Sequence, residues 1–418
     1  MDRGAMRFLC RFMAATIVAL AVTASASAAP VETVLHSFTG GKNGAQPSTA
    51  LIADANGALY GTASGGDGNL GLVFRLTPPA QGKTFWTETV LWRFKGGTDG
   101  GAPKGGLIAD ANGALYGTTT SAGGMFGAGT VFKLTPPAKG KTVWTETTLY
   151  SFTGGKDGGS PIGGLVADAN GALYGAALNG GTQTMGVVFM LTPPAIGKTV
   201  WTETVLWNFT GGADGAYPNG DLLNVGGRLY GTAVGGGADG FGVAFQLTPP
   251  GEAWTETILH TFTGGSDGAY PRAGLMAGNA GFFGTTNYGG SAPGYGGFGV
   301  VFQLGLPIVN GQWTETTLHA FTGGLDGRLP LAGLWEADFN RGVYGTTFEG
   351  GINKLGVAFR LRPPAKGQTV WTEIVLENFG GNKGSAPTAG LLNVNGILYG
   401  TTPNGGAYKN GVVFKLTP

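Results

Sequence analysis

The chain has 418 residues, 25 Lys+Arg against 24 Asp+Glu, and a single cysteine. This sparse and balanced charge, with no basic run beyond the first thirty residues, argues against nucleic acid as a partner. One cysteine cannot form a disulfide within the chain or supply the thiolate set of a structural zinc site.

The first thirty residues differ from all that follow. Three arginines precede an apolar run at residues 12–23 and the small-residue stretch "ASASAAP". This order predicts a secretory signal peptide at residues 1–28 that is cleaved after Ala28. Cleavage at this site would remove Cys10 from the mature chain. The apolar run is short for a bilayer, and no later stretch approaches a membrane span. We therefore expect residues 29–418 to be a single soluble domain, secreted or periplasmic, and monomeric.

A glycine-rich decapeptide of the type "FTGGSDGAYP" then recurs along the whole chain. Its seven copies begin at Phe38, Phe94, Phe152, Phe209, Phe262, Phe321 and Phe379, at spacings of 56, 58, 57, 53, 59 and 58 residues. Between copies come four blocks in constant order, namely Pro-x-x-x-Leu-(Ile/Val)-Ala-Asp, "GALYGTT", "GTVFKLTPP" and "WTETVLWRF". Each block is rich in β-branched and aromatic residues and is bounded by turn residues, which indicates a strand.

Seven units of about 57 residues with four strands each predict an all-β, seven-bladed β-propeller. A β-solenoid is the alternative, although its coils usually need fewer residues. A first copy of the fourth block, "VETVLHSF", precedes any complete unit, and the last unit stops after its third block. We therefore expect residues 31–38 to complete blade seven beside residues 387–418, which would cover an otherwise exposed sheet edge.

Glycine makes up 83 of the 418 residues and recurs in register with the blocks. The glycine after each Tyr of the second block lies inside a predicted strand, where it indicates a bulge or the close approach of another backbone. The repeated Tyr and Phe residues are expected to pack between blades as core rather than to form a carbohydrate platform.

Strand alternation places the decapeptide loops on one face, together with the loops that follow each Tyr-Gly-Thr. We call this the Asp-Gly face, and its variable loops make it the expected binding face. The candidate binding residues in the decapeptides are Asn43, Asp99, Asp157, Asp214, Asp267 and Asp326. Two interpretations stay open: these side chains cap their own turns, or several of them converge near the central opening and bind a cation or a hydroxyl-rich ligand.

Other polar residues also recur in register. The "ADANG" segments at Asp54, Asp110 and Asp168 predict hairpin turns rather than calcium loops. The glutamates of the fourth block are expected to be solvated residues of the outer strand; they are Glu32, Glu88, Glu146, Glu203, Glu256, Glu315 and Glu373. His36, His260 and His319 share one repeat position and are too dispersed for one metal site. No catalytic triad, zinc motif or phosphate loop is visible, so we expect no catalytic residue, metal or cofactor.

The recurring pattern "LYSFTGGKDG…GLVADANGALYGA…GVVFMLTPP" resembles the choice-of-anchor GloVer tandem-repeat family of exported bacterial proteins. The resemblance covers nearly all of residues 29–418 and implies architecture and export, but no activity. Family members commonly end in a surface anchor, and the resemblance does not extend to one here. "DANGALYG" is also similar to an Asp-x-x-Gly-x-Leu-Trp element of sensor and lyase propellers, which implies no catalytic residue.

The sequence thus favours an exported, non-enzymatic module that binds a glycan, peptide or protein on the Asp-Gly face. The alternatives are a propeller enzyme, such as a polysaccharide or peptide lyase or hydrolase with carboxylates at the central opening, and a purely structural envelope protein. Propellers host all three. Two or three non-repeated polar residues at the axis would favour the enzyme, whereas a uniform apolar or glycine lining would favour binding or structure.

Overall fold

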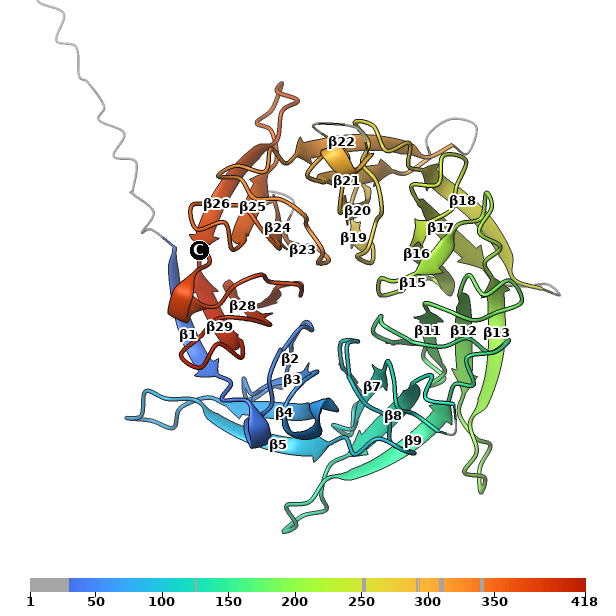
Figure 1. Cartoon of the computed structure of the whole chain (residues 1–418), viewed down its shortest axis with the longest axis vertical. Helices are drawn as coiled ribbons and strands as arrows, with labels where there is room; N and C mark the ends of the chain where they lie inside the picture. Colours follow the sequence, from blue (N-terminus) through green and yellow to red (C-terminus); the bar gives the residue numbers. More distant parts are fainter. Residues whose placement is uncertain are drawn as a thin grey trace, which may run out of the picture.

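The computed structural model describes residues 30–418 except 125, 250–252, 291, 293, 308–311 and 339–341. The predicted signal peptide at residues 1–28 therefore lies outside the described residues. Seven small antiparallel sheets stand in a ring, and the strands of each sheet are ordered from the axis outward to the rim (Figure 1). The prediction of a seven-bladed β-propeller is confirmed.

Each blade takes its four main strands from the four blocks of the repeat. The innermost strands are β2 (Ile52–Ala53), β6 (Ile108–Ala109), β10 (Val166–Ala167), β15 (Leu223–Val225), β19 (Met276–Gly278), β23 (Trp335–Asp338) and β27 (Leu392–Val394). The second strands are β3 (Leu59–Ala63), β7 (Leu115–Thr119), β11 (Leu173–Ala177), β16 (Arg228–Gly235), β20 (Gly281–Thr286), β24 (Gly342–Thr347) and β28 (Ile397–Thr402).

The two outer positions follow the same order around the ring. The third strands are β4 (Leu72–Thr77), β8 (Thr130–Thr135), β12 (Val187–Thr192), β17 (Val243–Thr248), β21 (Val300–Gly305), β25 (Val357–Arg362) and β29 (Val412–Thr417). The outermost strands are β5 (Thr87–Arg93), β9 (Thr145–Ser151), β13 (Thr202–Asn208), β18 (Thr255–Thr261), β22 (Thr314–Ala320), β26 (Thr372–Asn378) and β1 (Val31–Ser37).

A few elements depart from this plan. An additional strand that the sequence did not predict, β14 (Ala216–Pro218), pairs with β16 in the fourth blade. Four short 3-10 turns lie in loops, at Gly41–Asn43, Asp67–Asn69, Gly294–Gly296 and Gly381–Lys383. None of the helical segments that the structure describes has the length and apolar character needed to span a bilayer.

The ring is closed by its two chain ends. β1 pairs antiparallel with β29, from Val31 opposite Thr417 to Ser37 opposite Val412, and the seventh sheet has the order β1-β29-β28-β27. β1 and β29 lie side by side at the rim in Figure 1. The predicted closure is confirmed, and it covers the edge of β29 that would otherwise be open to another chain.

The core repeats from blade to blade and lies within and between the sheets. In each unit the decapeptide phenylalanine meets the third-strand phenylalanine of the next blade; Phe152 and Phe189, for example, are both fully buried with ring centroids 5.0 Å apart at 65°. Tyr174 is also buried and meets Trp254 of the next blade at 6.4 Å. The prediction that the repeated aromatic residues are core is confirmed.

The glycine after each Tyr has a different partner from the one expected. A Cβ at Gly61 would lie 2.7 Å from the ring of Phe74 and 2.8 Å from Leu51. The close approach is therefore that of a core phenylalanine ring, not of another backbone. The β-bulge of this blade lies one pair of strands further out, where the register of β4 and β5 shifts between Val73 and Phe74.

Candidate functional site

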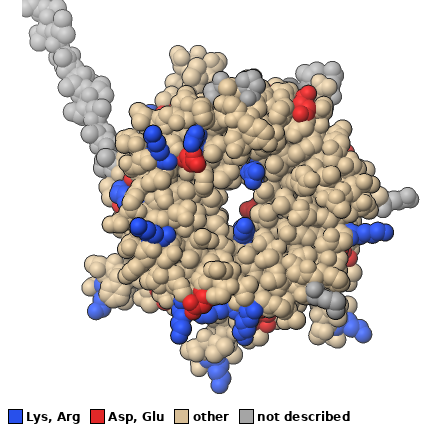
Figure 2. Space-filling model, viewed as in Figure 1, with Lys and Arg blue, Asp and Glu red and all other residues tan. Residues whose placement is uncertain are grey.

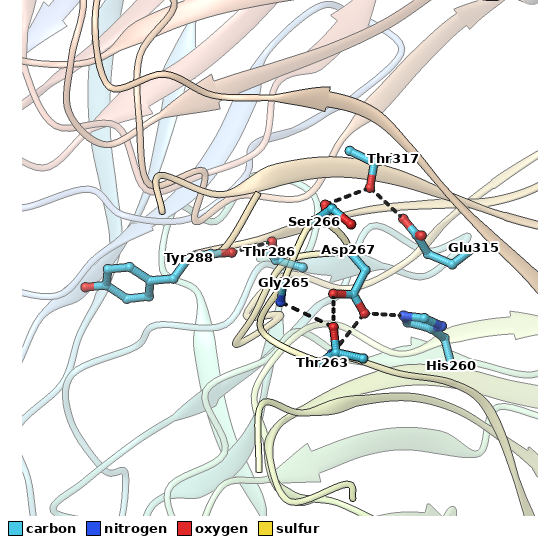
Figure 3. A network of polar contacts seen from close by, with 9 residues as sticks. All are labelled: His260, Thr263, Gly265, Ser266, Asp267, Thr286, Tyr288, Glu315 and Thr317. Carbon is cyan, nitrogen blue, oxygen red and sulfur yellow. Dashed lines mark hydrogen bonds and ion pairs between the residues drawn. The ribbon is translucent and has the colours of Figure 1, made fainter. Parts of the chain in front are cut away.

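The decapeptide loops use their acids to hold their own turns. Asp267 accepts hydrogen bonds from the Thr263 backbone N–H at 2.9 Å and the Thr263 hydroxyl at 2.6 Å, and its other contact is His260 Nε2 at 3.0 Å (Figure 3). These bonds, with the contact to His260, hold the pKa of Asp267 below its usual value even though burial acts to raise it. The following Gly268 has φ +92°, a conformation that favours glycine.

The equivalent acids repeat this arrangement. Each accepts a hydrogen bond from the backbone N–H four residues earlier, as Asp99 from Lys95, Asp157 from Thr153, Asp214 from Thr210 and Asp326 from Thr322. Asn43 lies in the short 3-10 turn Gly41–Asn43. None of the six lies among the described residues that line the central channel. This geometry matches the turn interpretation, and ligand binding at these residues stays a prediction.

The "ADANG" turns are hairpins, as expected. Asp110 accepts hydrogen bonds from the backbone N–H groups of Asn112 and Ala114, both at 2.9 Å, and from the Tyr116 hydroxyl at 3.1 Å. The carboxylate therefore closes its own turn and anchors the tyrosine of the second strand.

The glutamates of the outermost strands are not the solvated residues that the sequence predicted. The side chain of Glu88 is only 9% exposed and that of Glu32 fully buried. Burial raises the pKa to about 7 for Glu315 and to about 8 for Glu256, whose neighbour Asp214 adds to the shift. Residues of the preceding decapeptide loop lie close to several of these glutamates, as Asp214 does to Glu256 and Lys383 to Glu32. The alternation within one strand does not show these neighbours.

Figure 3 shows one of these junctions, between the fourth and fifth blades. The Thr317 hydroxyl bonds the backbone carbonyl of Ser266, in the preceding loop, at 3.0 Å and Glu315 Oε1 at 3.2 Å. Glu315 and Asp267 thus belong to one polar network that joins two blades at the rim.

The junction between the sixth and seventh blades uses other charges. Lys383 takes the place of the decapeptide acid, and Glu377 takes the place that His260 has in the fourth blade. Lys383 Nζ lies 3.1 Å from Glu377 Oε1 and 3.5 Å from Glu32 Oε2. The two exceptions to the repeat therefore compensate each other. Within the described residues, no group of three or more His, Cys, Asp and Glu side chains could hold a metal ion.

A channel of about 550 Å³ opens at the axis of the ring, a volume within the range of small-ligand sites (Figure 2). Its lining includes Gln46, Ser64 and Asn404, which belong to loops of the Asp-Gly face. The mouth of the channel therefore lies on that face.

The wall of the channel is built from the three residues between the Pro and the Leu of the first block. The third of these is Gly or Ala in six blades. The second is also Gly or Ala in six blades, and there neighbouring blades touch. A Cβ at Gly220 would lie 2.2 Å from the Gly274 backbone nitrogen of the next blade, and one at Gly163 would lie 2.8 Å from the Gly220 carbonyl oxygen. Threonines of the second strands also join neighbouring blades, as Thr232 does by donating to the Ala273 carbonyl at 2.8 Å.

The residue directly after the Pro is different in every blade, although all seven line the channel. The seven are Ser48, Lys104, Ile162, Asn219, Arg272, Leu331 and Thr388. We call them the mouth ring. Lys104 belongs to the second blade and Arg272 to the fifth, so they stand across the opening from each other. Figure 2 shows two basic side chains at the edge of the opening, one above the other, and an acidic one at the edge between them.

The acid in the channel is Asp221, at a position that is Gly or Ala in the other six blades. It accepts a hydrogen bond from the Gly164 backbone N–H of the third blade at 2.5 Å. That blade has Ala176 where Thr232 stands in the fourth, so it lacks the threonine link. The surrounding protein raises the pKa of Asp221, and the Gly164 hydrogen bond opposes this. Lys104 and Arg272 have no side-chain partner among the described residues.

The sequence did not predict the mouth ring because the first block indicates a strand and leaves three of its positions unspecified. The available signal was the contrast among those three positions, where charge occurs only at Lys104, Asp221 and Arg272.

A sequence profile described as the Gloeobacter/Verrucomicrobia repeat matches residues 21–154, 119–343 and 257–418. The chain belongs to the Gloeobacter/Verrucomicrobia repeat family. The resemblance expected from the sequence is thereby confirmed. Among curated proteins, none matches this member of the family.

Solved structures similar to this Gloeobacter/Verrucomicrobia repeat protein are distant. A putative oxidoreductase (glucose dehydrogenase) from Thermus thermophilus is 14% identical over 93% of this chain and 99% of its own, with a TM-score of 0.45. A Trypanosoma rangeli sialidase in complex with sialic acid is 9% identical over 93% and 58%, with a TM-score of 0.41. The surface component PorZ of Porphyromonas gingivalis is 12% identical over 91% and 48%, with a TM-score of 0.41. Similarity at this level does not bear on activity.

Proposed function

We propose that the protein is an exported, non-enzymatic binding module whose ligand site is the mouth of the central channel. The observation that carries the proposal is the mouth ring. The residues around it are repeated because the fold requires them, whereas the ring itself differs in every blade. It holds two cations that have no side-chain partner among the residues the structure describes.

The chemistry of the mouth favours an anionic ligand. Lys104 and Arg272 stand on opposite sides of the opening, both exposed, and Asp221 is the one carboxylate among the described residues that line the channel. A guanidinium binds a carboxylate through two parallel hydrogen bonds, and an ammonium adds a compact charge. Asn219, Ser48 and Thr388 supply neutral hydrogen-bonding groups to the same opening. A ligand that carries acidic groups and hydroxyls fits this set.

The site is expected to act after export. The order of basic, apolar and small residues in the first thirty positions supports a cleaved signal peptide and hence a secreted or periplasmic location. N-terminal sequencing of the protein from its native host should find Ala29 or a near neighbour as the first residue. An intact Met1 on most of the protein would contradict export by this route.

Binding at the mouth can be tested with a charge-matched pair of double variants. Wild-type protein, Lys104→Ala/Arg272→Ala and Lys139→Ala/Lys198→Ala are applied to an array of acidic and neutral glycans and peptides. Lys139 and Lys198 are exposed and belong to the hairpins between third and fourth strands, away from the channel. We expect acidic probes to bind the wild type and the hairpin variant but not the mouth variant. Equal binding by all three proteins would refute the proposal.

A polysaccharide lyase is the second candidate, because Lys104, Asp221 and Arg272 are non-repeated polar residues at the axis, the feature expected of an enzyme. We place it second because Asp221, the one carboxylate among these three, is held by the Gly164 N–H in the link between the third and fourth blades. Elimination from an acidic sugar needs a cation on the sugar carboxylate and a base that removes the proton from the carbon next to it. The glycosidic oxygen then leaves from the following carbon, takes up a proton and leaves a carbon–carbon double bond. Incubation with polygalacturonate, followed by ultraviolet absorbance of the unsaturated product, tests this candidate. Product formation that Lys104→Ala/Arg272→Ala abolishes would replace the binding proposal with the enzyme.

A further inference from the structure

A cluster of three tyrosines lies on the Asp-Gly face of the fifth blade. Tyr270 and Tyr295 are stacked, with ring centroids 4.8 Å apart and planes at 22°. Tyr288 meets Tyr295 edge-on at 5.0 Å, and Phe241 of the fourth blade meets Tyr270 at 5.6 Å. Tyr295 is 70% exposed, so this cluster is a surface feature and not part of the repeated core. We call Tyr270, Tyr288 and Tyr295 the tyrosine shelf.

The shelf is specific to this blade. Two of its members lie in the loop between β20 and β21, where Phe283 and Phe302 are 19 positions apart; the equivalent residues of the other six blades are 14 to 16 apart. The fifth blade therefore carries the longest loop of its kind. In Figure 3 the Tyr288 ring points away from the Asp267 network, so it takes no part in the junction that the loops share.

The shelf adjoins the mouth ring along the chain. Tyr270 precedes Arg272 by two residues and has φ +56°. Its backbone N–H donates to the Phe241 carbonyl at 2.8 Å, which holds this strained residue in place. The fourth blade repeats the arrangement, with Tyr217, 39% exposed, two residues before Asn219. Aromatic rings thus flank two neighbouring positions of the mouth ring.

We propose that the tyrosine shelf and the mouth ring form one extended site for an anionic polysaccharide. A sugar ring stacks on the exposed face of Tyr295, and the acidic groups of the next sugar residues are bound by Arg272 and Lys104. Tyrosine suits the first task because it combines a broad apolar ring with a hydrogen-bonding hydroxyl. The cations suit the second because, within the described part of the chain, no carboxylate pairs with them. This inference rests on the proposed binding function.

The test compares short and long probes on the full mature chain. Galacturonic acid, hexagalacturonate, a sulfated chondroitin hexasaccharide and neutral cellohexaose are titrated by calorimetry. We expect hexagalacturonate or the sulfated hexasaccharide to bind at least about ten-fold more tightly than cellohexaose. The preference between these two distinguishes carboxylate from sulfate as the bound group. Tyr295→Ala should weaken hexasaccharide binding by about ten-fold, since one stacked ring is lost. It should leave galacturonic acid binding unchanged.

Tyr408→Ala is the matched control, because Tyr408 is 58% exposed in the equivalent loop of the seventh blade. It should bind every probe like the wild type. If Tyr295→Ala binds the hexasaccharides like the wild type, while Lys104→Ala/Arg272→Ala weakens galacturonic acid, the shelf inference is wrong and the proposed function stands. If no acidic probe depends on Lys104 and Arg272, the proposed function fails and the shelf inference with it.

Discussion

Ring closure by the N-terminal strand can be tested at one residue, Phe38. Phe38 follows β1, is fully buried, and its backbone N–H donates to the Gly411 carbonyl of the seventh blade at 3.0 Å. Its ring meets Phe74 of the first blade at 5.2 Å and 67°. A residue near the start of a chain is usually dispensable. Here it joins the first blade to the seventh, so its loss should affect the whole ring.

The expected loss of stability can be judged from an equivalent phenylalanine at an internal position of the repeat. Phe209 is equally buried and meets Phe245 at 5.3 Å and 65°. Replacing a buried Phe by Ala costs about 3 to 5 kcal/mol. For a domain of this size that corresponds to a fall of about 4 to 6 °C in melting temperature. We expect Phe38→Ala and Phe209→Ala to fall in this range together, and Val31→Ala, which is 59% exposed in the same strand, to change little.

Thermal unfolding followed by circular dichroism, with urea unfolding as a second measure, checks this expectation. In an open array the stability is nearly a sum over neighbouring repeats, so a terminal substitution costs only the terminal unit. A Phe38→Ala protein that melts within about 1 °C of the wild type, while Phe209→Ala is clearly destabilised, would refute closure.

Three further predictions concern the rim, the axis and the decapeptide turns. The folded pKa of Glu256, about 8, lies above its ordinary value of 4.5, so stability present at acidic pH is lost as pH rises through 8. Glu256→Gln should therefore raise the free energy of unfolding at pH 8 by about 1 to 2 kcal/mol, a range reduced for the partial exposure of the side chain. It should leave the free energy of unfolding unchanged near about pH 5. Equal gains at both pH values would contradict this expectation. Gly220→Ala should cost about 1 to 3 kcal/mol by overpacking, whereas Gly106→Ala, which meets nothing within 4 Å, should melt like the wild type. Asp267→Ala should cost about 0.5 to 2 kcal/mol in urea unfolding, and a calcium-dependent rise in melting temperature that this variant abolishes would favour a cation site instead.

The fold could be predicted because every repeat restates it. Seven copies of four strand-like blocks, with the missing strand of the last unit at the start of the chain, left few other arrangements. The predictions that were wrong concern side-chain surroundings that are set by other strands and by neighbouring blades. Gly61 accommodates the Phe74 ring and Glu88 is covered by the preceding blade, and neither contact is visible in the alternation of one strand.

The candidate site was harder to predict because its residues do not recur from one repeat to the next. The acids of the decapeptides were conspicuous since they recur, yet the bonds of Asp267 show that recurrence follows from turn geometry. The mouth ring has no recurring residue, so a search for shared motifs passes over it. Only the arrangement in space, with Lys104 and Arg272 brought to one opening from distant blades, makes the set recognisable.

Residues that depart from the repeat fall into two kinds. Some are paired with a second residue that also departs from it, and others are not. Lys383 departs from the repeat, but Glu377 departs with it and the two pair at 3.1 Å. Asp221 also departs from the repeat. Its hydrogen bond joins the fourth blade to the third, which has Ala176 in place of the threonine that makes this link elsewhere. Such pairs restore a polar contact at the junction of two blades. Lys104 and Arg272 restore nothing, since no described side chain pairs with either. Two cations held at the mouth of the channel without a structural partner are accounted for if an anionic ligand is the partner, and that is why the binding experiment is centred on them.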